Sequence, residues 1–299
     1  AMQIRSVLFI VGVLLVCVGA SLVLPLGVSL WYGDGAFLGL LSSLVIMVGG
    51  GLALAYTNRS QTPLNLTLRD GFAVVGICWI VASFAGGLPF VLTSTASVTD
   101  AVFEAASGFT TTGATIFADI EGLPHGLLMW RSLTHWIGGL GIILLSLIVL
   151  PLLGVGGMQL YRAEVTGPSP DKLTPRMQDT ALTLWRVYCL MTIMLTVLLY
   201  IAGMDWFDAL NHSFSTVATG GFSTKNNSIA AYPQASIQWI LIFFMFIAGI
   251  NFSLHAQALR GGVKVYLRDR ECRFYTVLLI LGSAVIVAGL VEHGLFGMR

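Results

Sequence analysis

Charged residues are scarce in this chain of 299 residues: Asp, Glu, Lys and Arg together make up 10% of it, whereas hydrophobic residues make up 56%. An average soluble domain carries about 25% charged residues, which keep its surface in water. The apolar surface that so little charge leaves uncovered must therefore contact lipid. This composition excludes a soluble enzyme, and the net charge of +1 gives no reason to expect nucleic-acid binding.

Catalytic and metal-binding motifs are missing as well. The four cysteines form no CxxC pair, and the five histidines show no HExxH spacing. The sequence therefore indicates neither a disulfide framework nor a zinc site. Residues 154–157, Gly-Val-Gly-Gly, lack the preceding strand and the ribose-binding acid of a nucleotide site. We expect no enzymatic activity and no cofactor.

Long apolar runs are what the sequence has instead. A helix needs about 20 apolar residues to cross the hydrocarbon core of a bilayer. Seven stretches qualify: 6–31, 36–56, 71–93, 127–150, 182–203, 237–259 and 274–292. Gly-Asp-Gly at 33–35 joins the first two, which predicts an antiparallel helical hairpin. The predicted fold is an all-α multi-pass membrane protein.

Basic residues are distributed unevenly between the two sides of these spans. Twelve Lys and Arg residues precede the first span or fall in every second connection after it, and three fall on the other side. Cytoplasmic segments carry the excess of Lys and Arg in membrane proteins. The N-terminus is therefore predicted to be cytoplasmic.

The outer stretches 94–126 and 204–236 are unlike ordinary loops. Each has an acidic residue, Asp100 or Asp208, at the start of about two apolar helical turns, and the two copies align at a constant offset of 108 residues. Helices this short cannot cross a bilayer, so each must enter the membrane and return. The C-terminal carbonyls of such a helix point toward the membrane centre and favour a cation there.

Thr/Gly-rich sequence follows each short helix. Residues 107–115 read SGFTTTGAT, and residues 212–224 read HSFSTVATGGFST. A glycine that can adopt unusual backbone angles allows successive carbonyls to turn toward one axis and replace the hydration shell of an ion. Either string alone is compatible with a flexible outer loop. Two copies at one offset, each between spans, favour an ion pathway.

These two segments resemble the first and second pore loops of the Trk/Ktr/HKT superfamily of potassium transporters, and most closely those of the bacterial TrkH/TrkG group of uptake subunits. The resemblance includes the N-terminal hairpin, WIGGLGIILL at 136–145 and LPLLGVGGMQLYRAE at 150–164, and so covers nearly the whole chain. It implies K+ uptake across a bacterial inner membrane. In that family four span–pore-helix–filter–span units surround one pathway with pseudo-fourfold symmetry.

Carried over residue by residue, the resemblance assigns one filter glycine to each loop, Gly113 and Gly221. The carbonyls of Thr111, Thr112, Thr219 and Gly220 would then bind K+, the transported ion. The complete implied filter set is Thr110, Thr111, Thr112, Gly113, Ala218, Thr219, Gly220 and Gly221. Asp100, Arg131 and Asp208 are expected to support the pore loops, with Arg131 as an anchor near the outer end of its span.

The resemblance also divides the chain into an N-terminal hairpin (1–60), a first pore unit (61–157), a second pore unit (158–265) and the start of a third (266–299). Two loops cannot encircle an ion. We therefore expect the chain to be part of a longer protein and to conduct no K+ alone. The implied partners are lipid, a second copy of the full-length subunit, and a cytosolic nucleotide-binding ring of the RCK type.

Two other functions are weighed against this one. An ion-coupled secondary transporter with broken helices usually places ionisable residues at mid-membrane, and no Asp or Glu lies in the core of a predicted span. An intramembrane enzyme would need a nucleophile with a base or a metal site, and none is recognisable. Gly138, Gly139 and Gly141 in the fourth span are interpreted as a small-residue surface that lets a neighbouring element approach closely.

Overall fold

The computed structural model describes residues 4–59, 68–152 and 173–292, and within these ranges the chain consists of helices and loops. The helices are α1 (Ile4–Ser21), α2 (Val23–Tyr32), α3 (Phe37–Thr57), α4 (Leu68–Leu92), α5 (Val98–Phe109), α6 (His125–Leu152), α8 (Leu173–Ile201), α9 (Trp206–Val217), the short 3₁₀ helix η2 (Ser228–Ala231), α10 (Ala235–Ala248), α11 (Phe252–Gly261), α12 (Lys264–Arg268) and α13 (Arg270–Glu292).

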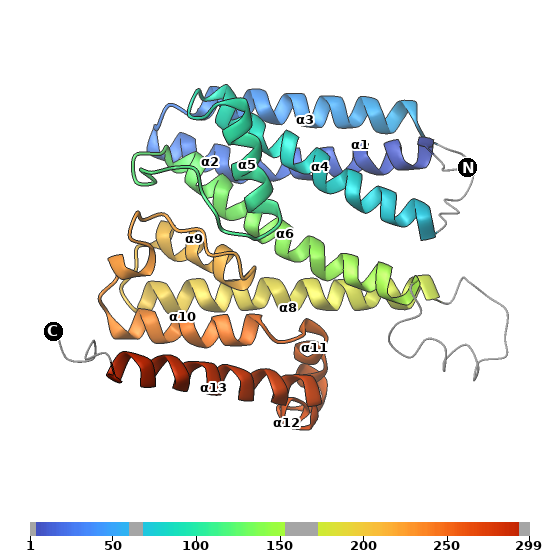
Figure 1. Cartoon of the computed structure of the whole chain (residues 1–299). Helices are drawn as coiled ribbons and strands as arrows, with labels where there is room; N and C mark the ends of the chain where they lie inside the picture. The colour runs from blue at the N-terminus through green and yellow to red at the C-terminus, as the bar shows by residue number, and fades with distance from the viewer. Residues whose placement is uncertain (1–3, 60–67, 153–172, 293–299) are drawn as a thin grey trace, which may run out of the picture.

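The long helices lie side by side, and α6 runs between two groups of them (Figure 1). On one side α1 packs against α3 and α4 packs against α5, while on the other α8 packs against α9 and α10. Helix α6 contacts both short helices, α5 and α9. The helix that follows the first candidate loop in sequence is therefore the element that joins the two halves.

The all-helical membrane fold is confirmed. Among the described residues, five helices are long and apolar enough to cross a membrane: Ile4–Tyr32, Phe37–Thr57, Gly71–Leu92, Asp179–Ile201 and Arg270–Val291. Helix α6 covers the predicted span 127–150. Residues 154–157 and most of segment 150–164 lie outside the described residues.

The prediction of one continuous span over 237–259 is wrong. Helix α10 ends at Ala248, α11 begins at Phe252, and the two are bent by 97°. A cap explains where α11 begins, and a close contact with α13 lies beside the break. The side-chain oxygen of Asn251 caps α11 by accepting from the backbone N–H of Ser253 at 3.0 Å. A Cβ at Gly249 would lie 2.9 Å from Cζ of Tyr275 on α13, so the backbone there approaches that ring too closely for a side chain.

The turn after α2 fixes the hairpin to α6. Gly33 ends α2 in the left-handed conformation, which glycine adopts without steric cost. The carboxylate of Asp34 accepts from the backbone N–H of Ala36 at 3.0 Å and from that of Gly126 at 2.7 Å. Because the first N–H groups of α6 have no partner within the helix, Asp34 both closes the turn and binds the start of α6.

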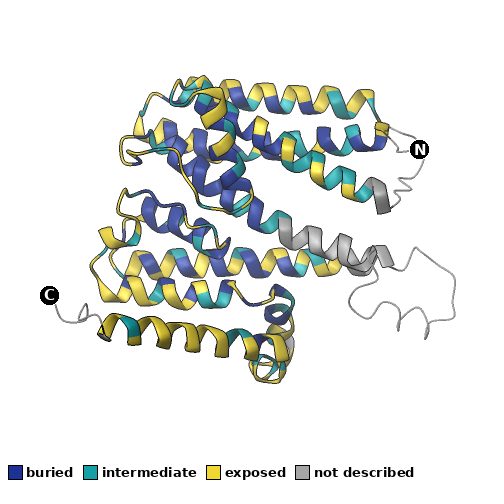
Figure 2. Ribbon diagram, viewed as in Figure 1, coloured by how far each residue is buried: buried dark blue, intermediate teal, exposed yellow. Residues whose placement is uncertain are grey.

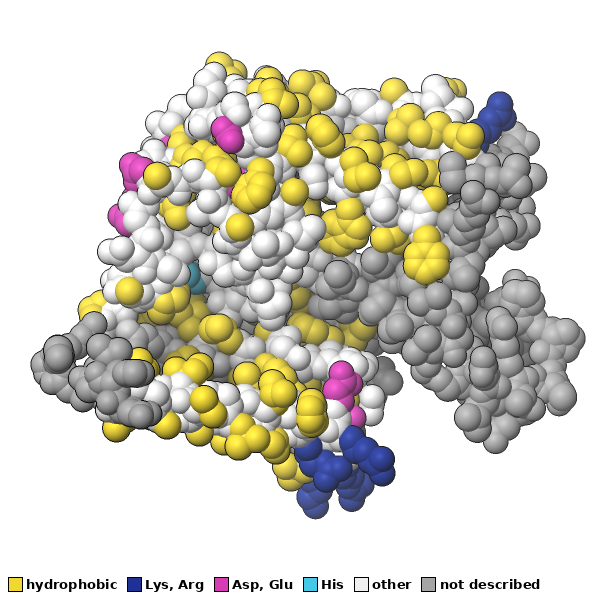
Figure 3. All heavy atoms as spheres, in the orientation of Figure 1, with side chains coloured by type: hydrophobic (Ala, Val, Ile, Leu, Met, Phe, Trp, Pro, Cys, Tyr) yellow, Lys and Arg dark blue, Asp and Glu magenta, His cyan; other side chains and the backbone are white. Residues whose placement is uncertain are grey.

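Burial is concentrated where α5, α6 and α9 meet, whereas α13 is exposed along most of its length (Figure 2). Hydrophobic side chains spread over the face of the molecule that Figure 3 shows. On that face Lys and Arg gather at the end where α12 lies, and Asp and Glu lie mainly at the opposite end. An apolar band between two polar ends is the surface that a bilayer covers.

Candidate functional site

Two short helices enter the fold from the same end. Helices α5 and α9 each contain 12 residues, somewhat longer than the predicted two turns. At 1.5 Å per residue they are about 18 Å long and cannot span a bilayer. After each helix the chain returns to the end from which it came (Figure 1). We refer to residues 110–115 as the first loop and to residues 218–223 as the second loop.

The backbone of the two loops repeats at the offset of 108 residues. Thr111 and Thr219 both have positive φ, 53° and 56°, and so do Gly113 and Gly221, 77° and 95°. The N–H of Thr112 donates to the carbonyl of Ser107 at 2.9 Å, and the N–H of Gly220 donates to that of Ser215 at 2.8 Å. Each short helix thus ends in a Schellman motif with threonine at the left-handed position that glycine usually occupies. A non-glycine residue at positive φ is uncommon, and this chain has one at the same place in both copies.

The two loops touch one another. A Cβ at Gly113 would overlap the carbonyl oxygen of Gly220 and lie 3.3 Å from its carbonyl carbon. Farther out, Asn226 accepts from the N–H of Ile120 at 2.6 Å and donates to the carboxylate of Asp119 at 3.2 Å. The structure therefore brings the predicted residues 110–113 and 218–221 together in one place.

Arg131 on α6 binds the last residue of each loop. It forms an ion pair with Glu104 of α5 at 2.7 Å, and the two side chains are only 1% and 0% exposed. Its other nitrogens donate to Oγ1 of Thr115 at 3.1 Å and to the backbone carbonyl of Ser223 at 3.2 Å. Its guanidinium carbon also lies 4.3 Å from the centre of the Phe222 ring. A planar fork with several fixed donors suits such a junction.

Glu104 and His212 occupy equivalent positions at the 108-residue offset, and Glu104 was not among the three residues predicted to support the loops. Glu104 accepts from the N–H of Ile116 at 3.0 Å and from the hydroxyl of Thr115 at 2.9 Å. Nδ1 of His212 lies 2.7 Å from the carbonyl of Asp208 and must carry the proton, so Nε2 accepts from the hydroxyl of Ser223 at 3.0 Å. Each side chain thus holds the residue two positions after the loop glycine.

The two predicted supporting acids differ in their surroundings. Asp100 is exposed and bonds the hydroxyl of Ser97 at 2.7 Å. Asp208 is buried, and its carboxylate accepts from Thr224 at 2.6 Å and Tyr232 at 2.7 Å and pairs with Lys225 at 3.1 Å. Burial alone would raise the pKa of Asp208, but these hydrogen bonds and the lysine charge hold its pKa below the ordinary value. Asp208 therefore holds the segment after the second loop, whereas the Asp100 carboxylate accepts from Ser97, the residue that caps α5.

The glycines of α6 bring both loops close to its backbone. A Cβ at Gly138 would lie 2.7 Å from the carbonyl carbon of Phe109, the last residue of α5. A Cβ at Gly139 would lie 2.9 Å from Cβ of Ala218, the first residue of the second loop. Gly141 has only Trp79 nearby, at 3.8 Å. At Gly138 and Gly139, the predicted small-residue surface thus lets the ends of the two short helices approach α6 closely.

The sequence matches the family described as TrkH, cation transport protein, over residues 41–292, which is most of the chain. The chain belongs to the TrkH family. It is 42% identical over 278 residues to the Trk system potassium uptake protein TrkH of Escherichia coli K12, and 43% identical over 290 residues to that of Halomonas elongata. These alignments cover 92% and 96% of this chain but 57% and 60% of the relatives.

A solved TrkH structure has the same fold. The crystal structure of the potassium transporter TrkH from Vibrio parahaemolyticus superposes with a TM-score of 0.89 at 36% identity, covering 99% of this chain and 61% of that one. The chain thus spans about three fifths of the length of the TrkH proteins that it matches. The matched family is a cation transport family and not an enzyme family.

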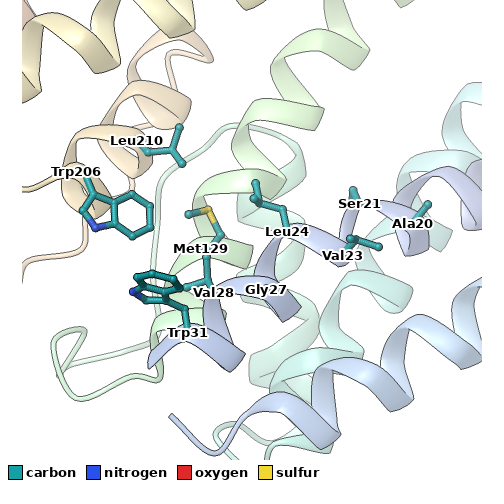
Figure 4. Close-up of a pocket in the computed structure, with 10 residues that line it drawn as sticks. All are labelled: Ala20, Ser21, Val23, Leu24, Gly27, Val28, Trp31, Met129, Trp206 and Leu210. Atoms are coloured by element: carbon teal, nitrogen blue, oxygen red, sulfur yellow. The ribbon is translucent and has the colours of Figure 1, made fainter. Parts of the chain in front are cut away.

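A separate groove lies away from the loops of this TrkH-family chain. It has a volume of about 550 Å³ and lies between α2 and α9, with Trp31 and Trp206 at one end (Figure 4). None of its ten lining residues is charged. A second hollow of about 440 Å³ borders the second loop at Thr219, Gly220 and Gly221 and reaches Tyr275 of α13. Of these two hollows, the one that borders the second loop is therefore the one next to the backbone of a predicted filter segment.

Proposed function

We propose that the full-length protein containing this chain takes up K+ through a channel-like pore, and that the two loops form two sides of its selectivity filter. The observation that carries the proposal is the repeated Schellman motif with its left-handed threonine and glycine, together with the contact of Gly113 and Gly220. The carbonyls of Thr111, Thr112, Thr219 and Gly220 are the proposed ligands of the ion.

The physical chemistry of the loops suits a cation. Helices α5 and α9 direct their C-terminal ends into the fold, where the partial negative charge of the helix dipole lowers the energy of a positive ion. Backbone carbonyls then replace the hydration shell of the ion. The relatives named as potassium uptake proteins support K+ as that ion.

The unit boundaries belong to the same proposal. Residues 1–60 form the hairpin, residues 61–157 and 158–265 form two pore units, and residues 266–299 begin a third. Asp100, Arg131 and Asp208 support the loops in this scheme. A dimer of the full-length subunit and an RCK-type nucleotide-binding ring on the cytosolic side complete the proposed assembly.

The proposed orientation places the end with α12 in the cytoplasm of a bacterial inner membrane and the loops outside. Lys264 and Arg268 then lie inside and Glu121 and Lys225 outside, as the excess of basic residues on inner segments requires. Single cysteines at these positions in a background without native cysteines will be labelled in intact cells with an impermeant maleimide. We expect labelling at 121 and 225 only, and labelling at 264 would reverse the topology.

Reconstitution of the full-length protein into liposomes tests the function itself. We expect K+ uptake that follows the K+ gradient and exceeds Na+ uptake when no hydrolysable nucleotide is added. Liposomes prepared without protein give the background. Equal K+ and Na+ fluxes would contradict a selective carbonyl filter, and absence of flux would contradict the pore.

An ion-coupled secondary transporter is the second candidate. The break between α10 and α11, bent by 97°, favours it because such transporters use interrupted helices at their binding sites. The two mechanisms differ in their response to a proton or Na+ gradient. K+ flux that continues when both gradients are collapsed favours the pore, whereas flux that stops favours the coupled transporter.

A further inference from the structure

His135 lies directly behind the second loop. It is on α6, one helical turn after Arg131, and its side chain is fully buried. Its ring stacks on the ring of Phe222, with centroids 4.0 Å apart and planes 15° from parallel. Its Nδ1 lies 3.3 Å from the hydroxyl oxygen of Ser215. The imidazole thus contacts both the last turn of α9 and the residue after the loop glycine.

The same ring limits residue 220. A Cβ added to Gly220 would lie 2.5 Å from Cγ and 2.6 Å from Cε1 of His135. Real Cβ atoms do not approach other atoms so closely, so a side chain at 220 would have to displace the ring or the loop. Gly220 is confined between this ring on one side and Gly113, which its carbonyl oxygen faces, on the other.

Backbone conformation does not explain the glycine at 220. Gly221 and Gly113 have positive φ, but Gly220 is absent from the positive-φ residues of the described chain. The equivalent position in the first loop is Thr112, whose N–H makes the matching hydrogen bond to the helix end, at 2.9 Å against 2.8 Å. A loop of this shape therefore accepts a side chain at that position, and what forbids one at 220 is the imidazole.

The two loops also differ at the serine beneath this position. Ser107 and Ser215 are related by the 108-residue offset, and each accepts the matching loop N–H through its carbonyl. The hydroxyl of Ser215 has His135 as a partner, whereas the buried hydroxyl of Ser107 has none among the described residues. The histidine support is therefore specific to the second loop.

We propose that His135 is a positioning residue for the second loop, whose imidazole ring fills the space behind Gly220 and thereby sets the direction of the Thr219 and Gly220 carbonyls. The proposal rests on the filter function proposed above. It makes His135 and Gly220 a matched pair, so that the glycine is needed only while the ring is present. Arg131 is the charged side chain nearest the ring on α6, and it holds Ser223 and Phe222 on the outer side of the same contact.

A double-mutant cycle in the full-length protein tests this pairing. His135→Ala leaves an unfilled volume behind the loop, and Gly220→Ala places a methyl group against the ring. We expect each single variant to lower the ratio of K+ to Na+ flux about tenfold, and the double variant to recover to within about threefold of the unmodified protein, because contacting residues are not additive. Thr112→Ala combined with His135→Ala serves as the control pair and should be additive.

Two further measurements keep the outcomes distinct. His135→Phe keeps a ring stacked on Phe222 and should fail to rescue Gly220→Ala. The rescue requires the volume that becomes free when the ring is removed, as in His135→Ala. Thermal unfolding of each purified variant reports packing independently of ion flux. If the two substitutions are non-additive in unfolding temperature but additive in the ratio of K+ to Na+ flux, His135 is only a packing residue and the proposal is overturned. A double variant whose flux ratio is no higher than that of the single variants would also overturn it. Absence of selective K+ flux from the unmodified protein would instead refute the filter function, and the thermal cycle would still decide the contact.

Discussion

Replacing Gly113 by serine in the full-length protein is expected to lower the ratio of K+ to Na+ flux by about tenfold or more, since positive φ and steric overlap act together there. Gly113 has φ of 77°, and a Cβ would overlap the carbonyl oxygen of Gly220 in the other loop. The new side chain must displace one of the two loops at the point where they touch. The ratio is measured in liposomes with protein levels matched by immunoblot.

Gly203 and Gly221 separate backbone strain from filter geometry. Their φ values are 101° and 95°, and a Cβ at either would meet nothing within 4 Å. Serine at 203 or 221 therefore costs similar backbone strain, but only residue 221 lies in one of the two proposed filter loops; residue 203 lies in the connection between α8 and α9. We expect Gly221→Ser to lower selectivity, less than Gly113→Ser does, and Gly203→Ser to leave it unchanged. Loss of selectivity in Gly203→Ser would show that strain alone produces the effect.

The repeat was predictable because its parts are local in sequence. Asp100 and Asp208 start matching short helices, and the Thr/Gly strings follow at the same offset. The Schellman motifs at Thr111 and Thr219 each depend on the backbone of only six successive residues, 107–112 and 215–220, so a repeated string yields a repeated conformation. The conformation of such a short segment follows from its own sequence and can therefore be predicted from it.

The supports of the loops were harder to predict because they depend on distant residues. Glu104 is in the helix that the sequence identified, yet its ion pair with Arg131 joins residues 27 positions apart, and the contact of Arg131 with Ser223 joins residues 92 apart. The difference between Asp100 and Asp208 arises from Tyr232 and Lys225, which have no counterpart at the same offset before α6. The offset alone could have paired Glu104 with His212 as equivalent positions.

The broken span shows a different limit. Residues 237–259 are apolar enough to cross a membrane as one helix, and hydropathy does not register the direction of the chain. The turn at Gly249 and the cap at Asn251 are conformational signals within an apolar run. Glycine followed within two residues by a capping asparagine would have indicated the break.

Removing the charge of Arg131 should destabilise the protein more than any other single change at a charged residue described above. Arg131→Met leaves the carboxylate of Glu104 buried without its partner, and breaking a buried ion pair from one side costs about 3–5 kcal/mol. The substitution also removes the donors that hold Thr115 and Ser223. We expect a lower thermal unfolding temperature, lower yield and lost K+ selectivity.

The partner substitution separates stability from loop positioning. In the double variant Arg131→Met with Glu104→Gln, neither partner of this buried pair carries a charge, and the glutamine oxygen can still accept from the N–H of Ile116. Stability should return toward that of the unmodified protein, since neutral replacement of a buried pair is often tolerated. Selectivity should stay low, because methionine donates nothing to the carbonyl of Ser223.

Lys225→Met is the matched control. The ion pair of Lys225 with Asp208 is more exposed, with 32% of the lysine side chain accessible, and its loss should cost no more than about 1 kcal/mol. Full recovery of selectivity in the double variant would show that Arg131 serves only to neutralise Glu104, and equal losses in Arg131→Met and Lys225→Met would contradict the buried junction itself.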